Sequence, residues 1–275
     1  MPAILLYLAA ALLYAGLAIY YWRTRWAPVG PAIDEPGGLG TEHYVMLMPL
    51  ALHTVLLAEA AFAPDGLHLG VGTAVSAILW LTVLIYWVGN FFYRLDGLQA
   101  LVMPAAALGV ILPLLLPEAK PLPNTSSLVF KVHLLIAMLA YSLFTIASLH
   151  VLLMTLLERH LHSADMPVVL QRLPPLLTME ALLFRILWAG FILLTLTIAT
   201  GVVFSEELFG KAARFNHKTV FGITSWVIFG ALLGGRYAYG WRGRVAVRWT
   251  LAGFVTLILA YIGTKFVVEV ILGRT

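Results

Sequence analysis

Eight long apolar stretches constrain this chain more than any other feature of its sequence. They cover roughly residues 3–22, 43–63, 70–90, 97–116, 129–157, 184–205, 217–239 and 247–272. A helix needs about 20 mostly apolar residues to cross the hydrocarbon core of a bilayer. The sequence therefore predicts an all-α integral membrane protein, a polytopic bundle of about eight transmembrane helices.

Composition excludes several classes of protein. Hydrophobic residues make up 61% of the chain and charged residues 11%, whereas a soluble domain carries about 25% charged residues. A soluble enzyme is therefore excluded. The chain has no cysteine, so it can form neither a thiolate metal site nor the CxxCH attachment of a covalent haem.

The chain is expected to form a single membrane domain over residues 1–275. No segment between the apolar stretches exceeds about 25–30 residues, which is too short for a separate soluble domain. Turn-forming groups separate the stretches, for example Pro64–Asp65–Gly66 and Arg94–Leu95–Asp96–Gly97.

The Lys and Arg residues predict the orientation, because cytoplasmic loops of membrane proteins carry an excess of them. With both termini on the outer side, the inner loops hold ten of the 17. These ten are Arg23, Arg25, Arg94, Arg159, Arg172, Arg185, Arg236, Arg242, Arg244 and Arg248. We therefore expect both termini on the outer, periplasmic or extracellular, side.

Ionisable side chains inside the apolar stretches are candidates for function, since burying them in a membrane is costly. They are His53, Glu59, His133, His150, Glu269 and, at the start of a stretch, His217. His53 is near the middle of its stretch, where a ligand role and a structural hydrogen bond to a neighbouring helix are both reasonable. His43, His68, His150, His160 and His162 are expected to be solvated or interfacial.

His133 and His217 are the pair best placed to bind a metal together. Each is near the N-terminus of a predicted helix on the outer side, so both can occupy the same depth on different helices. The helix dipole at that position favours the neutral imidazole, which is the form that binds a metal. Two such imidazoles could ligate a haem iron from its two faces, and Lys131 and Lys218 could receive the haem propionates. The alternative is two interfacial histidines in water.

Several segments in the same order resemble the cytochrome c assembly family, of the CcsA/ResC/CcmC type. The resemblance covers about residues 43–272 and is strongest over 130–272. Its segments are Phe130 to His133, Ala140 to Leu143, Leu182 to Arg185, Gly190–Phe191, Asn216 to Lys218, Trp226, Arg236, Gly240 to Arg244, Ala252 to Phe254 and Ala260 to Gly263. The first half, with His53 and Pro64–Asp65–Gly66, looks most like the YpjD/HemX-type branch.

The resemblance implies a haem-handling protein of the bacterial inner membrane. The sequence differs, however, from those of the haem synthetases in this family. Their Trp-rich signature ends in WDPKE, where this chain has Phe215 to Thr219. An inner and an outer histidine of the synthetases are replaced by Gly234 and Leu272, and only one outer histidine remains, as His133. We therefore expect an assembly factor without catalytic residues.

The expected function is haem binding in cytochrome c assembly or haem homeostasis. Because cysteine is absent, the cofactor would be a non-covalent haem b near the outer face. His133 would be a ligand, with His217 or His53 as the second. Partners would be haem, the lipid bilayer and other cytochrome-assembly or membrane proteins, with no nucleic acid. The alternatives are a non-catalytic scaffold or regulator that keeps the fold without the haem site, and a transporter that uses His53 and Glu59.

Overall fold

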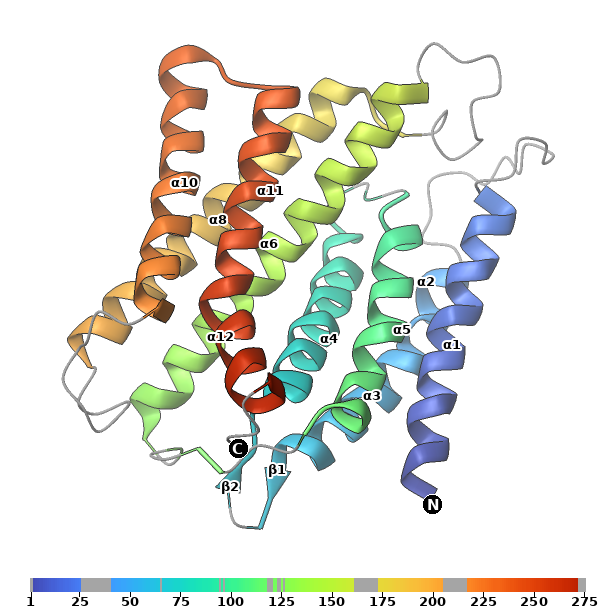
Figure 1. Ribbon diagram of the computed structural model, residues 1–275. Helices are drawn as coiled ribbons and strands as arrows, with labels where there is room; N and C mark the ends of the chain where they lie inside the picture. Colours follow the sequence, from blue (N-terminus) through green and yellow to red (C-terminus); the bar gives the residue numbers. More distant parts are fainter. Residues whose placement is uncertain are drawn as a thin grey trace.

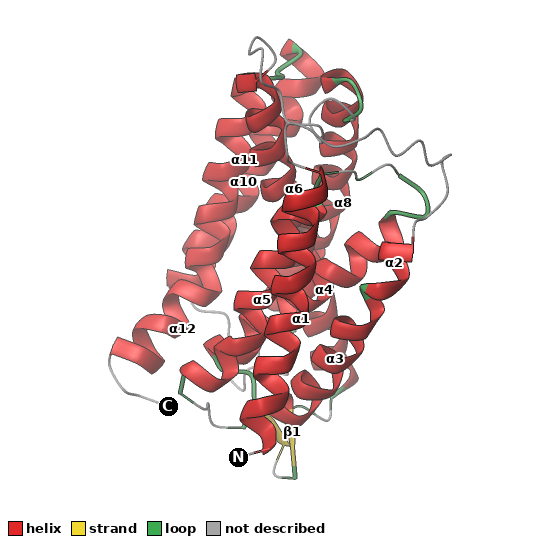
Figure 2. Cartoon of the chain, turned by 90° about the vertical axis from the view of Figure 1, so that its right-hand side faces the viewer, coloured by secondary structure: helices red, strands yellow, loops and turns green. Residues whose placement is uncertain are grey.

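The computed structural model describes residues 2–25, 41–64, 66–93, 95, 97–117, 121–122, 125, 127–160, 173–204 and 217–271. These residues are almost entirely helical (Figure 2). The helices are α1 (Pro2–Arg25), α2 (Thr41–Val45), α3 (Leu47–Ala61), α4 (Val71–Gly89), α5 (Gln99–Leu115), α6 (Leu128–His160), α8 (Leu176–Val203), α10 (His217–Tyr239), α11 (Arg244–Ile258) and α12 (Thr264–Phe266). The π-helical segments η1 (Leu259–Gly263) and η2 (Val267–Ile271) flank α12.

The helical bundle confirms an all-α polytopic membrane protein. Within the part of the chain that the structure describes, seven helical stretches are long and apolar enough to cross a membrane. The remaining predicted stretch is α5, whose 17 residues are at the short limit for a span. It packs against α1 and α4 (Figure 1).

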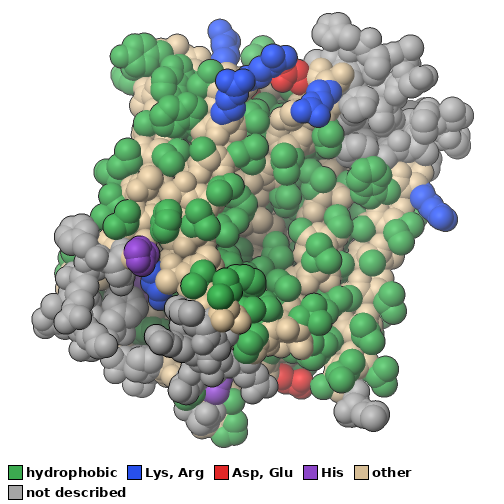
Figure 3. Space-filling view, viewed as in Figure 1, with side chains coloured by type: hydrophobic (Ala, Val, Ile, Leu, Met, Phe, Trp, Pro, Cys, Tyr) green, Lys and Arg blue, Asp and Glu red, His purple; other side chains and the backbone are tan. Residues whose placement is uncertain are grey.

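The two ends of the bundle differ in what they carry. The beginning of α1 and the end of the last helix lie at the same end (Figure 1), which we call the terminal end. The first turns of α6 and α10 and the hairpin of β1 (Phe62–Ala63) with β2 (Gly66–Leu67) are also there. Lys and Arg side chains gather at the opposite end (Figure 3). Most of the arginines predicted to be in inner loops are thus separated from the termini.

The helices form two groups along the chain. Helices α1, α3, α4 and α5 pack together, as do α6, α8, α10 and α11, and α4 packs against α6 to join the groups. The core of the second group is the fully buried ring stack of Phe144 on Phe229, with centroids 3.9 Å apart. Small residues allow this approach: a Cβ at Gly253 would lie 2.8 Å from the Phe229 ring.

The start of one helix and the interior of the last helix differ from the sequence prediction. Helix α8 begins at Leu176, directly after Pro174–Pro175, and not at residue 184. The helix therefore includes Glu180, which forms an ion pair with Arg236. The last helix contains η1 and η2, which apolar periodicity does not reveal.

Candidate functional site

The site is built from His133, which lies in the second turn of α6 at the terminal end. Its side chain is half-buried and faces α8. The imidazole Nδ1 is 2.8 Å from the Thr200 hydroxyl oxygen. Gly201 follows Thr200 in α8 and lies against the His133 ring. A Cβ added at Gly201 would be 3.4 Å from His133 Cε1. Glycine at this position leaves room for the ring.

Thr200 determines which nitrogen of His133 carries the proton. The Thr200 hydroxyl lies 2.8 Å from the Leu196 carbonyl and 3.2 Å from the Thr197 carbonyl. A carbonyl oxygen can only accept, so the single hydroxyl proton is donated to the backbone. His133 Nδ1–H must then donate to Thr200 Oγ1, and the lone pair of the imidazole is on Nε2. Histidine ligands of metals are typically oriented by a hydrogen bond of this kind from the other ring nitrogen.

This arrangement predicts an effect of Thr200→Val on haem affinity. Valine keeps the shape and removes the acceptor for Nδ1–H, and loss of such a supporting hydrogen bond typically costs 10–100-fold in metal affinity. We expect haem affinity to fall by about tenfold or more in a titration followed at the Soret band. Thr197→Val is the matched control, because the Thr197 hydroxyl bonds only to the Leu193 carbonyl in its own helix. Equal affinities for both variants would contradict this role of Thr200.

The other predicted residues of the outer site are at the same end of the bundle. His217 is the first residue of α10 and its side chain is exposed, as is that of Lys218. Lys131 is exposed on α6, two residues before His133. The structure thus places both histidines at one end, as predicted, with His133 half-buried and His217 on the surface.

His53 is in the other group of helices. It is fully buried in α3, its Nε2 is 2.9 Å from the Ser76 hydroxyl of α4, and its ring meets the edge of Tyr14 of α1. Ser142 of α6 bonds to the Ile78 carbonyl, which puts Ser76 near the level of residue 140. His53 is therefore displaced on the order of 10 Å along the bundle axis from His133. Its contacts are those of a structural histidine.

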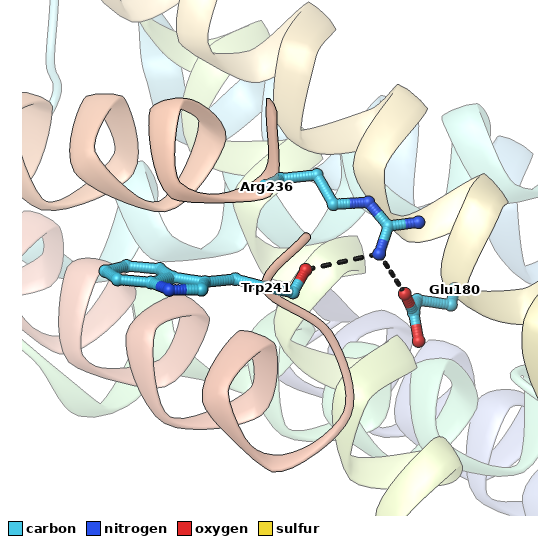
Figure 4. Close-up of polar contacts among 3 residues, drawn as sticks. All are labelled: Glu180, Arg236 and Trp241. Carbon is cyan, nitrogen blue, oxygen red and sulfur yellow. Dashed lines mark hydrogen bonds and ion pairs between the residues drawn. The ribbon is translucent and has the colours of Figure 1, made fainter. Parts of the chain in front are cut away.

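A buried ion pair lies at the opposite end of the bundle. Arg236 Nη1 of α10 donates to Glu180 Oε1 of α8 at 2.6 Å and to the Trp241 carbonyl at 3.2 Å (Figure 4). The guanidinium also lies over the Phe184 ring, 4.6 Å from its centroid. The five-residue spacing of Glu180 and Arg185 argues against a same-face pair, and the structure shows that Glu180 pairs with Arg236. Nothing in the sequence connects these two residues.

Two histidines expected to be solvated or interfacial are buried. His150 donates from Nε2 to the Met179 carbonyl at 2.9 Å. His43 is stacked on Trp87, with centroids 5.1 Å apart, and meets the edge of Phe91. The prediction was wrong for both because neighbouring helices cover them. The side chains of His160, His162 and Glu269 are outside the described residues.

The donor set suits a haem better than a bare metal ion. Within the described residues, no group of three or more His, Asp or Glu side chains could hold a metal ion. A haem brings four nitrogen ligands of its own and needs only one or two axial side chains from the protein. An oriented imidazole with basic side chains at the same end meets that requirement.

The comparisons with known proteins agree with this architecture. Residues 41–272 match the family model described as Cytochrome C assembly protein. The inner membrane protein YpjD of Escherichia coli (strain K12) is 29% identical over 266 residues, which cover 94% of this chain and 98% of that protein. The cytochrome c biogenesis protein CcsA of Gloeobacter violaceus is 32% identical over 92 residues, 34% of this chain and 27% of that protein. No solved structure matches significantly. Because the family model covers most of the chain, this protein belongs to the cytochrome c assembly family.

Proposed function

We propose that this protein binds haem at the terminal end of its bundle and handles it for cytochrome c assembly. The observation that carries the proposal is the 2.8 Å contact between His133 Nδ1 and Thr200 Oγ1, which orients the imidazole. Because the Thr200 hydroxyl donates to the Leu196 carbonyl, we assign Nδ1 as the donor and the lone pair to Nε2. Family membership supports the coarser part, a role in cytochrome c biogenesis. The similarity to the inner membrane protein YpjD supports placement in the bacterial inner membrane.

The residues of the chain have distinct parts in this proposal. His133 would hold the haem through its iron, and Thr200 would hold the His133 tautomer. His217, one residue before Lys218 at the same end, is the candidate second ligand, whereas His53 has the contacts of a structural histidine in the other group of helices. When bound, haem would supply an iron that imidazole can coordinate. Binding is non-covalent because the chain has no cysteine, so any covalent attachment to a cytochrome takes place on another protein.

The charge distribution supports an orientation with this site on the outer side. The turn between α10 and α11 lies at the end of the bundle opposite to the start of α6 (Figure 1), and Arg236, Arg242, Arg244 and Arg248 are in or near this turn. Basic residues in short loops favour the cytoplasmic side. The terminal end would then face the compartment in which cytochromes c are completed.

The test is an absorption spectrum of the detergent-solubilised protein, purified from haem-replete cells. We expect a Soret band, and a titration of the haem-free protein with haemin that saturates at one equivalent. A colourless preparation that takes up no haemin would overturn the proposal. It would favour the alternative of a scaffold that keeps the fold without the haem site, which the absence of the Trp-rich signature at residues 215–219 supports.

A further inference from the structure

Helix α11 carries two arginines, one turn apart, on the face that points away from the bundle. Arg244 and Arg248 are both exposed. The buried residues of the same helix are Ala246, Thr250, Gly253 and Leu257. At roughly 100° per residue, the two arginines lie opposite to the centre of this buried set. Since α11 packs on α10 and α6, the arginine face is turned away from both neighbours.

Exposed apolar residues continue the same face toward the middle of the bundle. Ala252, Val255 and Leu259 lie within roughly 80° of Arg244 around the helix axis, and all three are exposed. We call these three residues the apolar strip. The helix rises by roughly 16 Å from Arg248 to Leu259, and the hydrocarbon core of a bilayer is about 30 Å thick. The apolar strip therefore extends over the hydrocarbon layer of about one leaflet.

Tryptophans mark the depth of the arginines. The rings of Trp241 and Trp249 are in contact, with centroids 5.2 Å apart, and Trp249 directly follows Arg248. Tryptophan is enriched at the level of the lipid headgroups. The turn before α11 is at the end opposite to the two termini (Figure 1), where basic side chains gather (Figure 3). Arg244 and Arg248 thus lie at the headgroup level, and the apolar strip lies in the hydrocarbon.

The charge of this face complements an anionic headgroup. Neither α10 nor α11 contains an Asp or Glu. Arg244 Nε donates to Glu158 Oε1 of α6 at 3.2 Å, and the Arg244 side chain is 81% exposed. This bond uses one of the five N–H donors of the guanidinium. Arginine presents its donors in a planar fork that matches the oxygens of a phosphate.

We infer that the outward face of α11 binds one anionic phospholipid. Arg244 and Arg248 hold its phosphate, and one acyl chain lies along the apolar strip. The strip favours a lipid over a soluble anion, because a soluble anion makes no use of an apolar surface at the depth of the acyl chains. This inference concerns the end of the bundle opposite to His133 and does not depend on haem binding.

Native mass spectrometry of the purified full-length protein measures the affinity for the first bound lipid. Phosphatidylglycerol, which is anionic, is compared with phosphatidylcholine of the same acyl chains. Wild type is expected to prefer phosphatidylglycerol by about tenfold or more, since each basic residue near the membrane surface contributes about fivefold to the binding of anionic lipid. Arg248→Gln should lose about fivefold of this preference, and Arg244→Gln/Arg248→Gln should lose nearly all of it. Unchanged affinity for phosphatidylcholine shows that both variants are folded.

Three controls test the position of the charges and the role of the acyl chain. Arg23→Gln removes an exposed arginine near the end of α1, at the same end of the bundle, and should keep the preference. Arg244→Lys/Arg248→Lys keeps the charges and should keep most of it. Glycerol phosphate carries an anionic phosphate without acyl chains, and at equal concentration it should not displace bound phosphatidylglycerol.

Several outcomes would overturn the inference. Equal affinities of wild type for the two lipids would exclude an anionic-lipid site. Equal losses in Arg23→Gln and Arg248→Gln would show an effect of net charge and not of this face. Displacement by glycerol phosphate would show that the arginines bind a soluble anion without help from the apolar strip. If the double Gln variant does not fold, Arg248→Gln alone decides.

Discussion

Replacing His133 with glycine is expected to abolish haem binding, with affinity reduced by more than about 100-fold. This exceeds the 10–100-fold typical for a residue that only supports a ligand, because the change removes the ligand itself. The measurement is a haemin titration of the purified variant, followed at the Soret band. Ligation in the wild type requires the neutral imidazole with its lone pair on Nε2, which the Thr200 hydrogen bond provides.

Added imidazole distinguishes a lost ligand from a damaged fold. His133→Gly leaves a space where the ring was, beside Gly201, and free imidazole at millimolar concentration is expected to restore the haem spectrum. His217→Ala is the second comparison. If His217 is the other axial ligand, its loss should convert a six-coordinate spectrum to a five-coordinate one and retain the haem. Wild-type haem affinity in His133→Gly would remove His133 from the site.

The sequence predicts the membrane architecture well because a single physical requirement determines it. Apolar stretches of about 20 residues have few alternatives to spanning helices. His133 could be found for a related reason. Charged and imidazole groups are so scarce inside the spans that each one is a candidate.

The supporting residues of the site could not be found in this way. Thr200 is one of several threonines in α8, and Thr195 and Thr197 make the same backbone hydrogen bond to a residue four positions earlier. Only the packing of α8 on α6 selects Thr200 as the partner of His133. Likewise, the contact of Lys218 with the Tyr261 ring depends on how α10 packs on η1, and no local pattern encodes it.

The ion pair at the opposite end leads to the second large effect, on stability. Arg236→Met is expected to lower the free energy of unfolding by about 3–5 kcal/mol, the cost of removing one partner of a buried pair. Glu180 has a side chain that is only 8% exposed, so its carboxylate would remain buried without its cation. The measurement is unfolding in mixed micelles with increasing SDS, followed by tryptophan fluorescence.

Because Arg236 is more exposed than Glu180, we expect a substitution of Glu180 to cost less stability than a substitution of Arg236. The Arg236 side chain is 35% exposed and also bonds to the Trp241 carbonyl, so after Glu180→Gln it can reach water and keep a partner. That variant should cost only about 1–2 kcal/mol, closer to the loss of a single hydrogen bond. The double variant Glu180→Met/Arg236→Met should be more stable than Arg236→Met alone, since it leaves no buried charge.

The second ion pair of the described residues provides the matched control. Arg244 Nε is 3.2 Å from Glu158 Oε1, and the two side chains are 81% and 41% exposed. Exposed ion pairs contribute about 0–1 kcal/mol to stability. Arg244→Met should therefore change stability by less than about 1 kcal/mol. Equal losses in Arg236→Met and Arg244→Met would mean that burial of Glu180 does not determine the energy of its ion pair. A large loss in Arg236→Met alone would identify this pair as the contact that holds α8 and the α10–α11 turn together.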